Sequence, residues 1–191
     1  PLASLKGYVE TLQGSARDDV AARERFLRTM AEQAERMSRL VDDLLSLSRV
    51  EMREYLPPTD KVELGAILAE VARSLEPLSQ KAKIKLTLSP GEAGASVWGD
   101  RDELTQVFQN LLQNAIKYGR PGGTVNVRLV RESAPALRFR IDVIDDGPGI
   151  APADLTRIFE PFFTGRRAEG GTGLGLPIAR SLLAAARGEQ R

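Results

Sequence analysis

Three short motifs between residues 109 and 176 constrain the fold more than any other feature of the sequence. Asn110 and Asn114 lie four residues apart, so on a helix their side chains project from one face, one turn apart. A first glycine turn, residues 145–149, follows the strand-like run 139–144, and a second, residues 171–175, precedes an apolar, helix-like run. Backbone amides and the positive end of the helix dipole at such a loop-to-helix junction suit phosphate. The three motifs together therefore predict a nucleotide pocket.

Each motif alone has a simpler explanation. An asparagine pair also occurs on solvated helix faces or as a buried hydrogen-bonding pair, and Gly-x-Gly-x-Gly also occurs in flexible turns. Their order, together with the stretch Phe159-Glu160-Pro161-Phe162-Phe163, resembles the ATP-binding domain of bacterial sensor histidine kinases. The resemblance extends over essentially the whole chain. No Gly-x-x-x-x-Gly-Lys-Ser/Thr sequence occurs, so a P-loop nucleotide site is not supported.

Composition excludes several classes of function. The 191 residues hold 27 Lys and Arg against 26 Asp and Glu, a net charge of +1, which gives no sign of a nucleic-acid surface. Cysteine and histidine are both absent, so disulfides, thiolate metal sites and a phosphohistidine are excluded within these residues. No apolar run approaches the roughly 20 residues of a membrane helix, and no signal-peptide pattern opens the sequence. We expect a soluble piece of one to two domains.

The first 54 residues carry two helical patterns. Apolar residues recur at three- and four-residue spacing in the first pattern, and a polar, glycine-containing break at residues 14–19 follows it. The second pattern is a heptad seam of Phe26, Met30, Gln33, Met37, Leu40, Leu44 and Leu47. Because a narrow seam on two helices makes a poor isolated core, we predict a helical hairpin forming a dimeric four-helix bundle. The alternative is a hairpin that folds against its own second domain.

The same segment resembles the dimerisation domain of sensor histidine kinases. Pro1–Tyr8 is similar to the residues just after the phospho-acceptor histidine, and Arg39–Leu45 is similar to the second helix. The family's His-Glu stretch lies immediately upstream of the proline, so residues 1–54 are expected to form a dimerisation hairpin lacking the phospho-acceptor. Residues 55–61, with the helix-ending Pro57-Pro58, are the expected linker and hinge. Residues 62–191 are the expected ATP-binding catalytic domain.

Helix and strand patterns alternate through this second domain. Helical stripes run over residues 64–75 and 104–116, the latter after a predicted cap at Asp100. Strand patterns lie at residues 84–88, 97–98, 124–130 and 137–144. The alternation predicts an α/β fold, a two-layer α/β sandwich with helices on one face of a mixed sheet. The resemblance makes it a Bergerat-type ATP-binding domain.

Asp145 is the strongest single site prediction. A carboxylate at the pocket floor accepts a hydrogen bond from the exocyclic amine of adenine, whereas guanine presents a carbonyl oxygen there and is repelled. The alternative is an aspartate that only starts a turn before glycine. Gly147 and Gly149 would give the backbone its turn and its close approach. Asp146 departs from the asparagine that the family often has and adds a negative charge beside the pocket.

The resemblance assigns further roles around Asp145. Asn114 corresponds to the magnesium ligand, supported by Asn110, while Lys117 meets phosphate oxygens and Tyr118 lies against adenine or sugar. The alternative for Lys117 is a solvated charge at a helix end. Residues 150–170 are similar to the ATP lid, in which Arg166 or Arg167 screens the terminal phosphate unless the pair lies in a plain solvated loop. The predicted catalytic residues are Asn110, Lys117 and Arg166, and the predicted nucleotide contacts are Asn114, Tyr118, Asp145, Gly147, Gly149, Ile150, Phe159, Gly171, Thr172, Gly173, Leu174, Gly175 and Leu176.

The implied activity is that of a protein-histidine kinase with ATP and Mg²⁺ as cofactors. The γ-phosphoryl group would pass to a histidine of the dimerisation helix and then to an aspartate of a response regulator receiver domain. ATP hydrolases of the same superfamily place a glutamate base where this chain has Asn110, and an amide cannot take a proton from water, so hydrolysis is not expected as the main activity. The resemblance implies a cytoplasmic location, with anchoring to the inner membrane only through segments outside this sequence. From a different class, the alternative is a non-catalytic nucleotide-binding dimerisation module.

Overall fold

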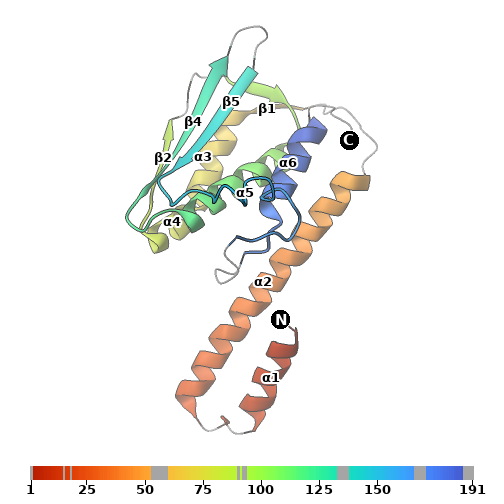
Figure 1. The fold of residues 1–191 in the computed structure, drawn as a ribbon, viewed down its shortest axis with the longest axis vertical. Coiled ribbons are helices and arrows are strands. Elements are labelled where there is room, and N and C mark those ends of the chain that lie inside the picture. Colours follow the sequence, from red (N-terminus) through yellow and green to blue (C-terminus); the bar gives the residue numbers. More distant parts are fainter. Residues whose placement is uncertain are drawn as a thin grey trace.

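Two antiparallel helices project from an α/β body in the computed structural model, which describes residues 2–14, 16–17, 19–52, 60–89, 91, 94–132, 138–165 and 171–186 (Figure 1). Helix α1 (Leu2–Gln13) and helix α2 (Val20–Met52) form the predicted hairpin. Asp19 caps α2, because its Oδ1 accepts a hydrogen bond from the Ala22 amide at 2.9 Å. The rings of Tyr8 and Phe26 stack with centroids 5.4 Å apart and join the two helices. Within the described ranges, no helix is both long and apolar enough to cross a membrane.

The body combines helices with a mixed sheet, as predicted. Its elements in chain order are β1 (Lys61–Glu63), α3 (Leu64–Ser74), α4 (Glu76–Ala82), β2 (Lys85–Ser89), β3 (Ser96–Trp98), α5 (Arg101–Tyr118), β4 (Thr124–Glu132), β5 (Arg138–Asp145) and α6 (Gly175–Ala186). Strand β4 is central, with β2 parallel to it on one side and β5 antiparallel on the other. Strands β1 and β3 form a separate antiparallel ribbon.

Strand β1 begins inside the segment predicted as a linker. Val62 is buried whereas Lys61 is exposed, an alternation too short to be recognised as a strand in the sequence. Pro57 and Pro58, the predicted hinge, lie outside the described residues. The domain boundaries therefore stay a prediction.

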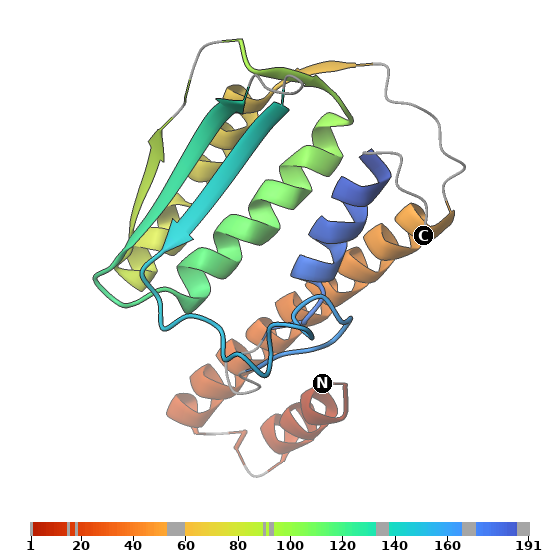
Figure 2. The same cartoon turned by 45° about the horizontal axis from the view of Figure 1, so that its top comes forward.

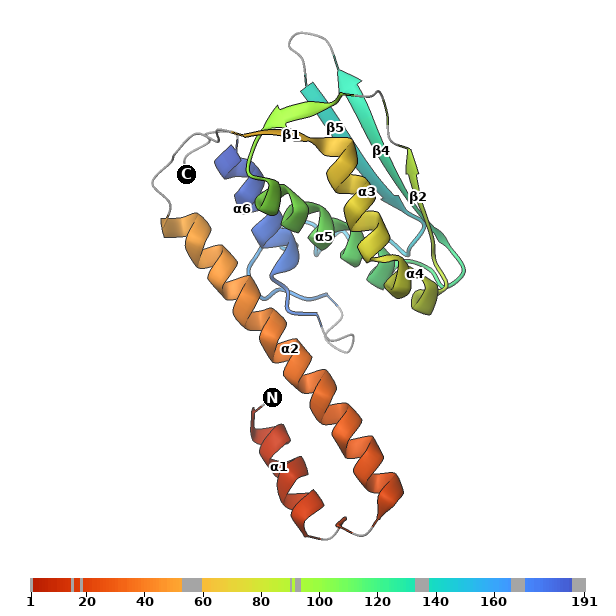
Figure 3. The ribbon, with the colours of Figure 1, turned by 180° about the vertical axis from the view of Figure 1, so that it is seen from behind.

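The helices cover one face of the sheet, which gives the two-layer arrangement (Figures 2 and 3). Alternate residues of β4 that face the helices, Val125 and Val127, are almost fully buried and pack in one core with Leu68 of α3 and Leu112 of α5. Asp145 is the register partner of Val125, so it lies on the helix-facing side of the sheet, at its end. The sheet geometry thus positions Asp145 beside the helices.

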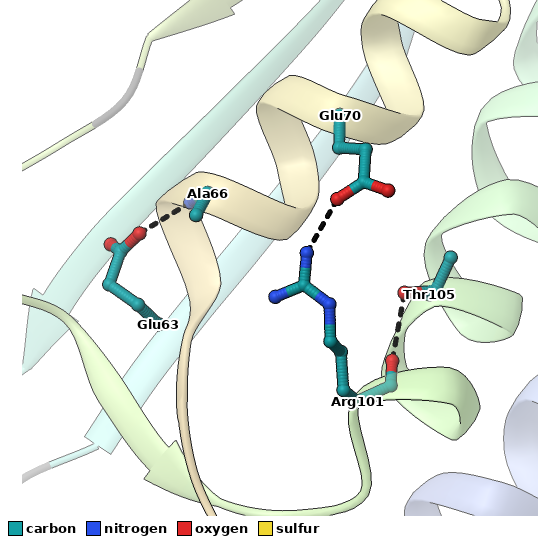
Figure 4. A network of polar contacts seen from close by, with 5 residues as sticks. All are labelled: Glu63, Ala66, Glu70, Arg101 and Thr105. Carbon is teal, nitrogen blue, oxygen red and sulfur yellow. Dashed lines mark hydrogen bonds and ion pairs between the residues drawn. The ribbon is translucent and has the colours of Figure 1, made fainter.

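Capping side chains fix where the helices of this layer begin. The carboxylate of Asp100 accepts hydrogen bonds from the amides of Asp102 at 2.8 Å and Glu103 at 3.1 Å, which confirms the predicted cap of α5. Glu63 caps α3 in the same way, and an ion pair of 2.5 Å between Arg101 and Glu70 joins the two helices (Figure 4). The cap therefore fixes the start of α5, and the ion pair links this first turn to α3.

Candidate functional site

Helix α5 has a buried apolar face and a polar face that points away from the core. Val107, Phe108, Leu112, Ala115 and Ile116 form the buried face. On the other face, the Nδ2 of Asn110 is buried and has no hydrogen-bond partner among the described residues. Its Oδ1 lies 3.4 Å from the position that a Cβ at Gly175 would take, at the first residue of α6. A buried amide without a partner costs about 1–3 kcal/mol, which a bound ligand can offset.

A second contact joins the last turn of α5 to the glycine loop, defined here as residues 171–174. A Cβ at Gly171 would lie 3.0 Å from both Lys117 Nζ and Tyr118 Oη. The ammonium group of Lys117 also lies 5.0 Å from the centroid of the Tyr118 ring. A cation and a phenol therefore flank the loop at its first residue, while their contacts with phosphate and adenine stay predictions.

The glycine loop keeps its shape only because Gly173 has no side chain. Gly173 has a φ of +71°, and a Cβ there would lie 2.6 Å from the carbonyl carbon of Phe162. The amide of Phe162 donates to the Gly173 carbonyl at 3.0 Å, so the phenylalanine-rich stretch runs directly against the loop. Leu174 is fully buried, which leaves only its backbone for a ligand.

The Asp145 turn packs against the end of α5. Oδ1 of Asp145 accepts from the Gly147 amide at 2.9 Å, and a Cβ at Gly147 would lie 2.7 Å from the Tyr118 carbonyl oxygen. Gly147 thus permits a close approach that a larger residue would prevent. The Asp145 carboxylate remains exposed, and its Oδ2 makes no hydrogen bond within the described chain. Gly149 has a φ of +72° and Ile150 is half exposed.

Asp146 has a structural partner of its own. Its Oδ2 accepts from the Thr124 amide at 2.9 Å, and its carboxylate lies against Gly123. The residue at which the chain departs from the family's usual asparagine therefore fixes the start of β4.

Several predicted site residues are not brought to these contacts. Phe159 lies under the guanidinium of Arg180 on α6, 5.0 Å from its ring centroid. Arg166 lies outside the described residues, as do all residues of the predicted lid after Gly165. Leu176 is half-buried within the first turn of α6. These assignments stay predictions.

Sequence reasoning missed a contact between α2 and the site. The hydroxyl of Thr172 donates to Asp43 Oδ2 at 2.9 Å, and the Gln106 amide donates to Ser46 Oγ at 2.8 Å. Leu40, predicted as part of the dimer seam, packs against the core of the α/β body. Burial raises the pKa of Asp43 above its ordinary value of 3.8, while the Thr172 hydrogen bond and the nearby Arg39 act in the opposite direction. Nothing in the sequence distinguishes Asp43 from an ordinary solvated carboxylate.

The arrangement fits a polyphosphate with a hard cation. The described residues contain no cluster of three or more His, Cys, Asp or Glu that would hold a metal ion. Asn114 of α5 offers an amide oxygen as a metal ligand. Its side chain is half-buried and has no hydrogen bond to another described residue. An unpartnered Asn110 amide, a glycine cradle at a helix start and the Lys117 cation together suit phosphate oxygens and Mg²⁺.

Two family models match the chain. The model of the His Kinase A (phospho-acceptor) domain matches residues 1–53. The model of the histidine kinase-, DNA gyrase B-, and HSP90-like ATPase matches residues 99–191. The first match covers the described part of the hairpin, and the second covers α5 and both glycine turns.

Individual proteins resemble the chain over nearly its whole length. The sensor protein SphS of Synechococcus elongatus is 34% identical over 98% of the chain and 46% of SphS. The histidine kinase AdeS of Acinetobacter baumannii superposes with a TM-score of 0.75 at 27% identity, over 97% of this chain and 84% of that one. The histidine kinase ThkA, solved in complex with the response regulator protein TrrA, has a TM-score of 0.73 at 24% identity, over 94% of this chain and 49% of that one, which shows the fold alone. The chain spans about half or less of the curated relatives it matches.

Proposed function

This chain belongs to the sensor histidine kinases, with a phospho-acceptor-type hairpin and a histidine kinase-type ATPase domain, and we propose that it binds Mg-ATP for phosphoryl transfer to a histidine. That histidine is not among the 191 residues. The observation that carries the proposal is the convergence of Asn110, Lys117 and Tyr118 on the glycine loop and the start of α6. These residues come from motifs separated by more than 50 positions in the sequence.

Asp145 selects adenine in this proposal. Its Oδ1 already accepts from the Gly147 amide, so the free Oδ2 is the acceptor for the exocyclic amine of adenine. Tyr118 lies next to this turn, because its carbonyl oxygen is close to Gly147. In this proposal the Tyr118 ring covers the base or the sugar.

The phosphates bind along the glycine loop. Lys117 supplies a positive charge at Gly171, and the backbone amides at the start of α6 supply donors. Asn114 and Asn110 offer neutral oxygen ligands for Mg²⁺, which when bound neutralises charge on the phosphate oxygens. Because an amide at residue 110 cannot accept a proton, water is not activated there, and transfer to histidine is favoured over hydrolysis. Arg166 is proposed to screen the terminal phosphate.

The proposed partners are a second copy of the chain and a receiver domain. Leu27, Val41, Leu44 and Leu45 of α2 are each more than half exposed, which supports a dimer through the hairpin. A receiver domain is proposed because the chain belongs to the sensor histidine kinases, in which the phosphoryl group is expected to pass from the histidine to a receiver aspartate. ThkA, which shares the fold, was solved with a response regulator protein. The proposed location is the cytoplasmic part of a membrane-anchored sensor.

Calorimetric titration tests the nucleotide site. We expect ADP and the non-hydrolysable analogue AMP-PNP to bind with Mg²⁺ dependence, and GTP to bind far more weakly. A histidine-containing dimerisation hairpin supplied in trans then tests transfer from ATP. Binding without transfer would favour the non-catalytic dimerisation module, and no binding to any adenine nucleotide would refute the proposed pocket.

A further inference from the structure

We propose that Asp43 of α2 is a positioning residue for the glycine loop, and that α2 and the terminal phosphate of the nucleotide compete for Thr172. The inference rests on the nucleotide site proposed above. It adds a residue of the dimerisation hairpin to the determinants of nucleotide affinity. It also identifies one hydrogen bond, between Asp43 and Thr172, through which nucleotide binding and the docking of α2 affect each other.

The Thr172 hydroxyl already uses its single proton in a hydrogen bond. It donates its one proton to Asp43 Oδ2 at 2.9 Å and accepts from the Leu174 amide at 3.3 Å. Because a hydroxyl has a single proton, it cannot donate to a phosphate oxygen while Asp43 holds it. Thr172 can therefore donate either to Asp43 or to a phosphate oxygen, but not to both.

The charge of Asp43 acts in the same direction. Thr172 follows Gly171, where Lys117 and Tyr118 approach the loop, and precedes Gly175, where Asn110 does. Asp43 thus contacts the loop assigned to phosphate directly, through the Thr172 hydroxyl. A carboxylate at this distance repels a phosphate anion, while Arg39 on the same helix acts against that charge and Asp42 adds to it.

Asp43 contributes to a wider contact between α2 and the body, in which Leu40 and Ser46 also take part. Leu40 packs against the core, and Ser46 accepts from Gln106 of α5. The views in Figures 1 and 3 show α6 between α5 and α2. Of these three, Asp43 is the contact that reaches the glycine loop. Coupling between two sites is reciprocal, so a terminal phosphate that takes Thr172 weakens α2 docking as much as docking weakens its binding.

A purely structural role for Asp43 predicts something different. If the Asp43–Thr172 bond only stabilised the interface, its loss would lower thermal stability. The ratio between the affinities for a triphosphate analogue and a diphosphate would then stay the same. Competition instead predicts a change confined to the nucleotide with a terminal phosphate.

The first test compares Asp43→Ala, which removes the acceptor of the Thr172 proton, with Asp42→Ala in the full chain. Both remove one negative charge from neighbouring positions, but Asp42 is exposed and makes no hydrogen bond to the loop. By calorimetry, we expect Asp43→Ala to bind Mg-AMP-PNP about fivefold more tightly than the unmodified chain, the low end of typical coupling because Asp43 is only half-buried. Mg-ADP should change less, and Asp42→Ala should behave as the unmodified chain does.

The second test measures docking directly. The chain has no cysteine, so Ser46→Cys with Gln106→Cys places one reactive pair across the interface without altering Asp43 or Thr172. A short bismaleimide should cross-link this pair more slowly with Mg-AMP-PNP than with Mg-ADP or without nucleotide. Equal affinities for all three proteins, or a cross-linking rate unaffected by a nucleotide that binds, would overturn the competition alone. No nucleotide binding by any variant would overturn the proposed function as well.

Discussion

Replacing Asp145 with asparagine should remove most of the affinity for adenine nucleotides without unfolding the chain. In the structure one carboxylate oxygen accepts from the Gly147 amide at 2.9 Å, and the other is free for the adenine amine. Asparagine has only one acceptor oxygen, so an amide donor must face either the Gly147 N–H or the adenine amine. Losing a hydrogen bond to a charged acceptor costs about 1.5–3 kcal/mol, equivalent to a roughly 10- to 150-fold weaker Kd.

Calorimetry with Mg-ADP measures this loss, and circular dichroism checks the fold. The matched control is Asp142→Asn on the opposite face of β5, where the residue pairs with Arg140 at 3.0 Å on the surface. The control should keep its ADP affinity and lose at most about 1 kcal/mol of stability. Asp145→Asn should also discriminate less against GTP, because its amide can donate to the guanine carbonyl. A folded Asp145→Asn variant with unchanged ADP affinity would refute the assignment, and so would an equal loss in the control.

Three further predictions concern the loop, the interface and the hairpin. Gly173→Ala should lose nucleotide affinity, and left-handed strain should lower its free energy of unfolding, measured by denaturant titration, by about 1–2 kcal/mol. Gly122→Ala, whose φ is +81° in open space, is the control that keeps affinity, and equal affinity losses would contradict the steric reason. The pKa of Asp43 is higher in the folded chain than its ordinary value of 3.8, so the folded chain binds this proton more tightly. The free energy of unfolding that proton binding adds is therefore fully present below pH 3.8 and is lost as the pH rises through the raised pKa. The difference in thermal midpoint between the chain and Asp43→Asn should therefore change only in the acid range, and a difference independent of pH would count against this. The chain should be a dimer by light scattering, and Leu44→Glu should shift it toward monomer; a monomeric parent at high concentration would remove the prediction.

Local patterns predicted those elements whose determinants lie close together in the sequence. Asp100 caps α5 through amides two and three residues away, and the polar face of α5 follows from helical spacing. The glycine loop leads into α6 as the motif indicated. Lys117 and Tyr118 lie at the loop, Asn110 lies at the start of α6, and Gly147 lies against the end of α5, although their roles toward a ligand stay predictions.

The features that sequence reasoning missed have a common cause. Strand β1 has too few residues to show an alternation, and Ile84 lies outside β2 because its amide bonds back to Ser79. The role of Asp146 depends on Thr124, 22 positions away. Each of these features is set by a partner that no local pattern specifies.

The sequence by itself determined the hairpin, the helix and strand types and the order of the glycine turns, because helix caps, side-chain periodicity and backbone sterics act over a few residues. Only the tertiary structure decided which surfaces meet. It showed that Leu40 packs against the α/β body and that Asp43 holds Thr172 across 129 positions of the sequence. Such contacts depend on how buried faces pack in space. In the sequence, an aspartate that becomes half-buried on folding cannot be distinguished from one that stays exposed.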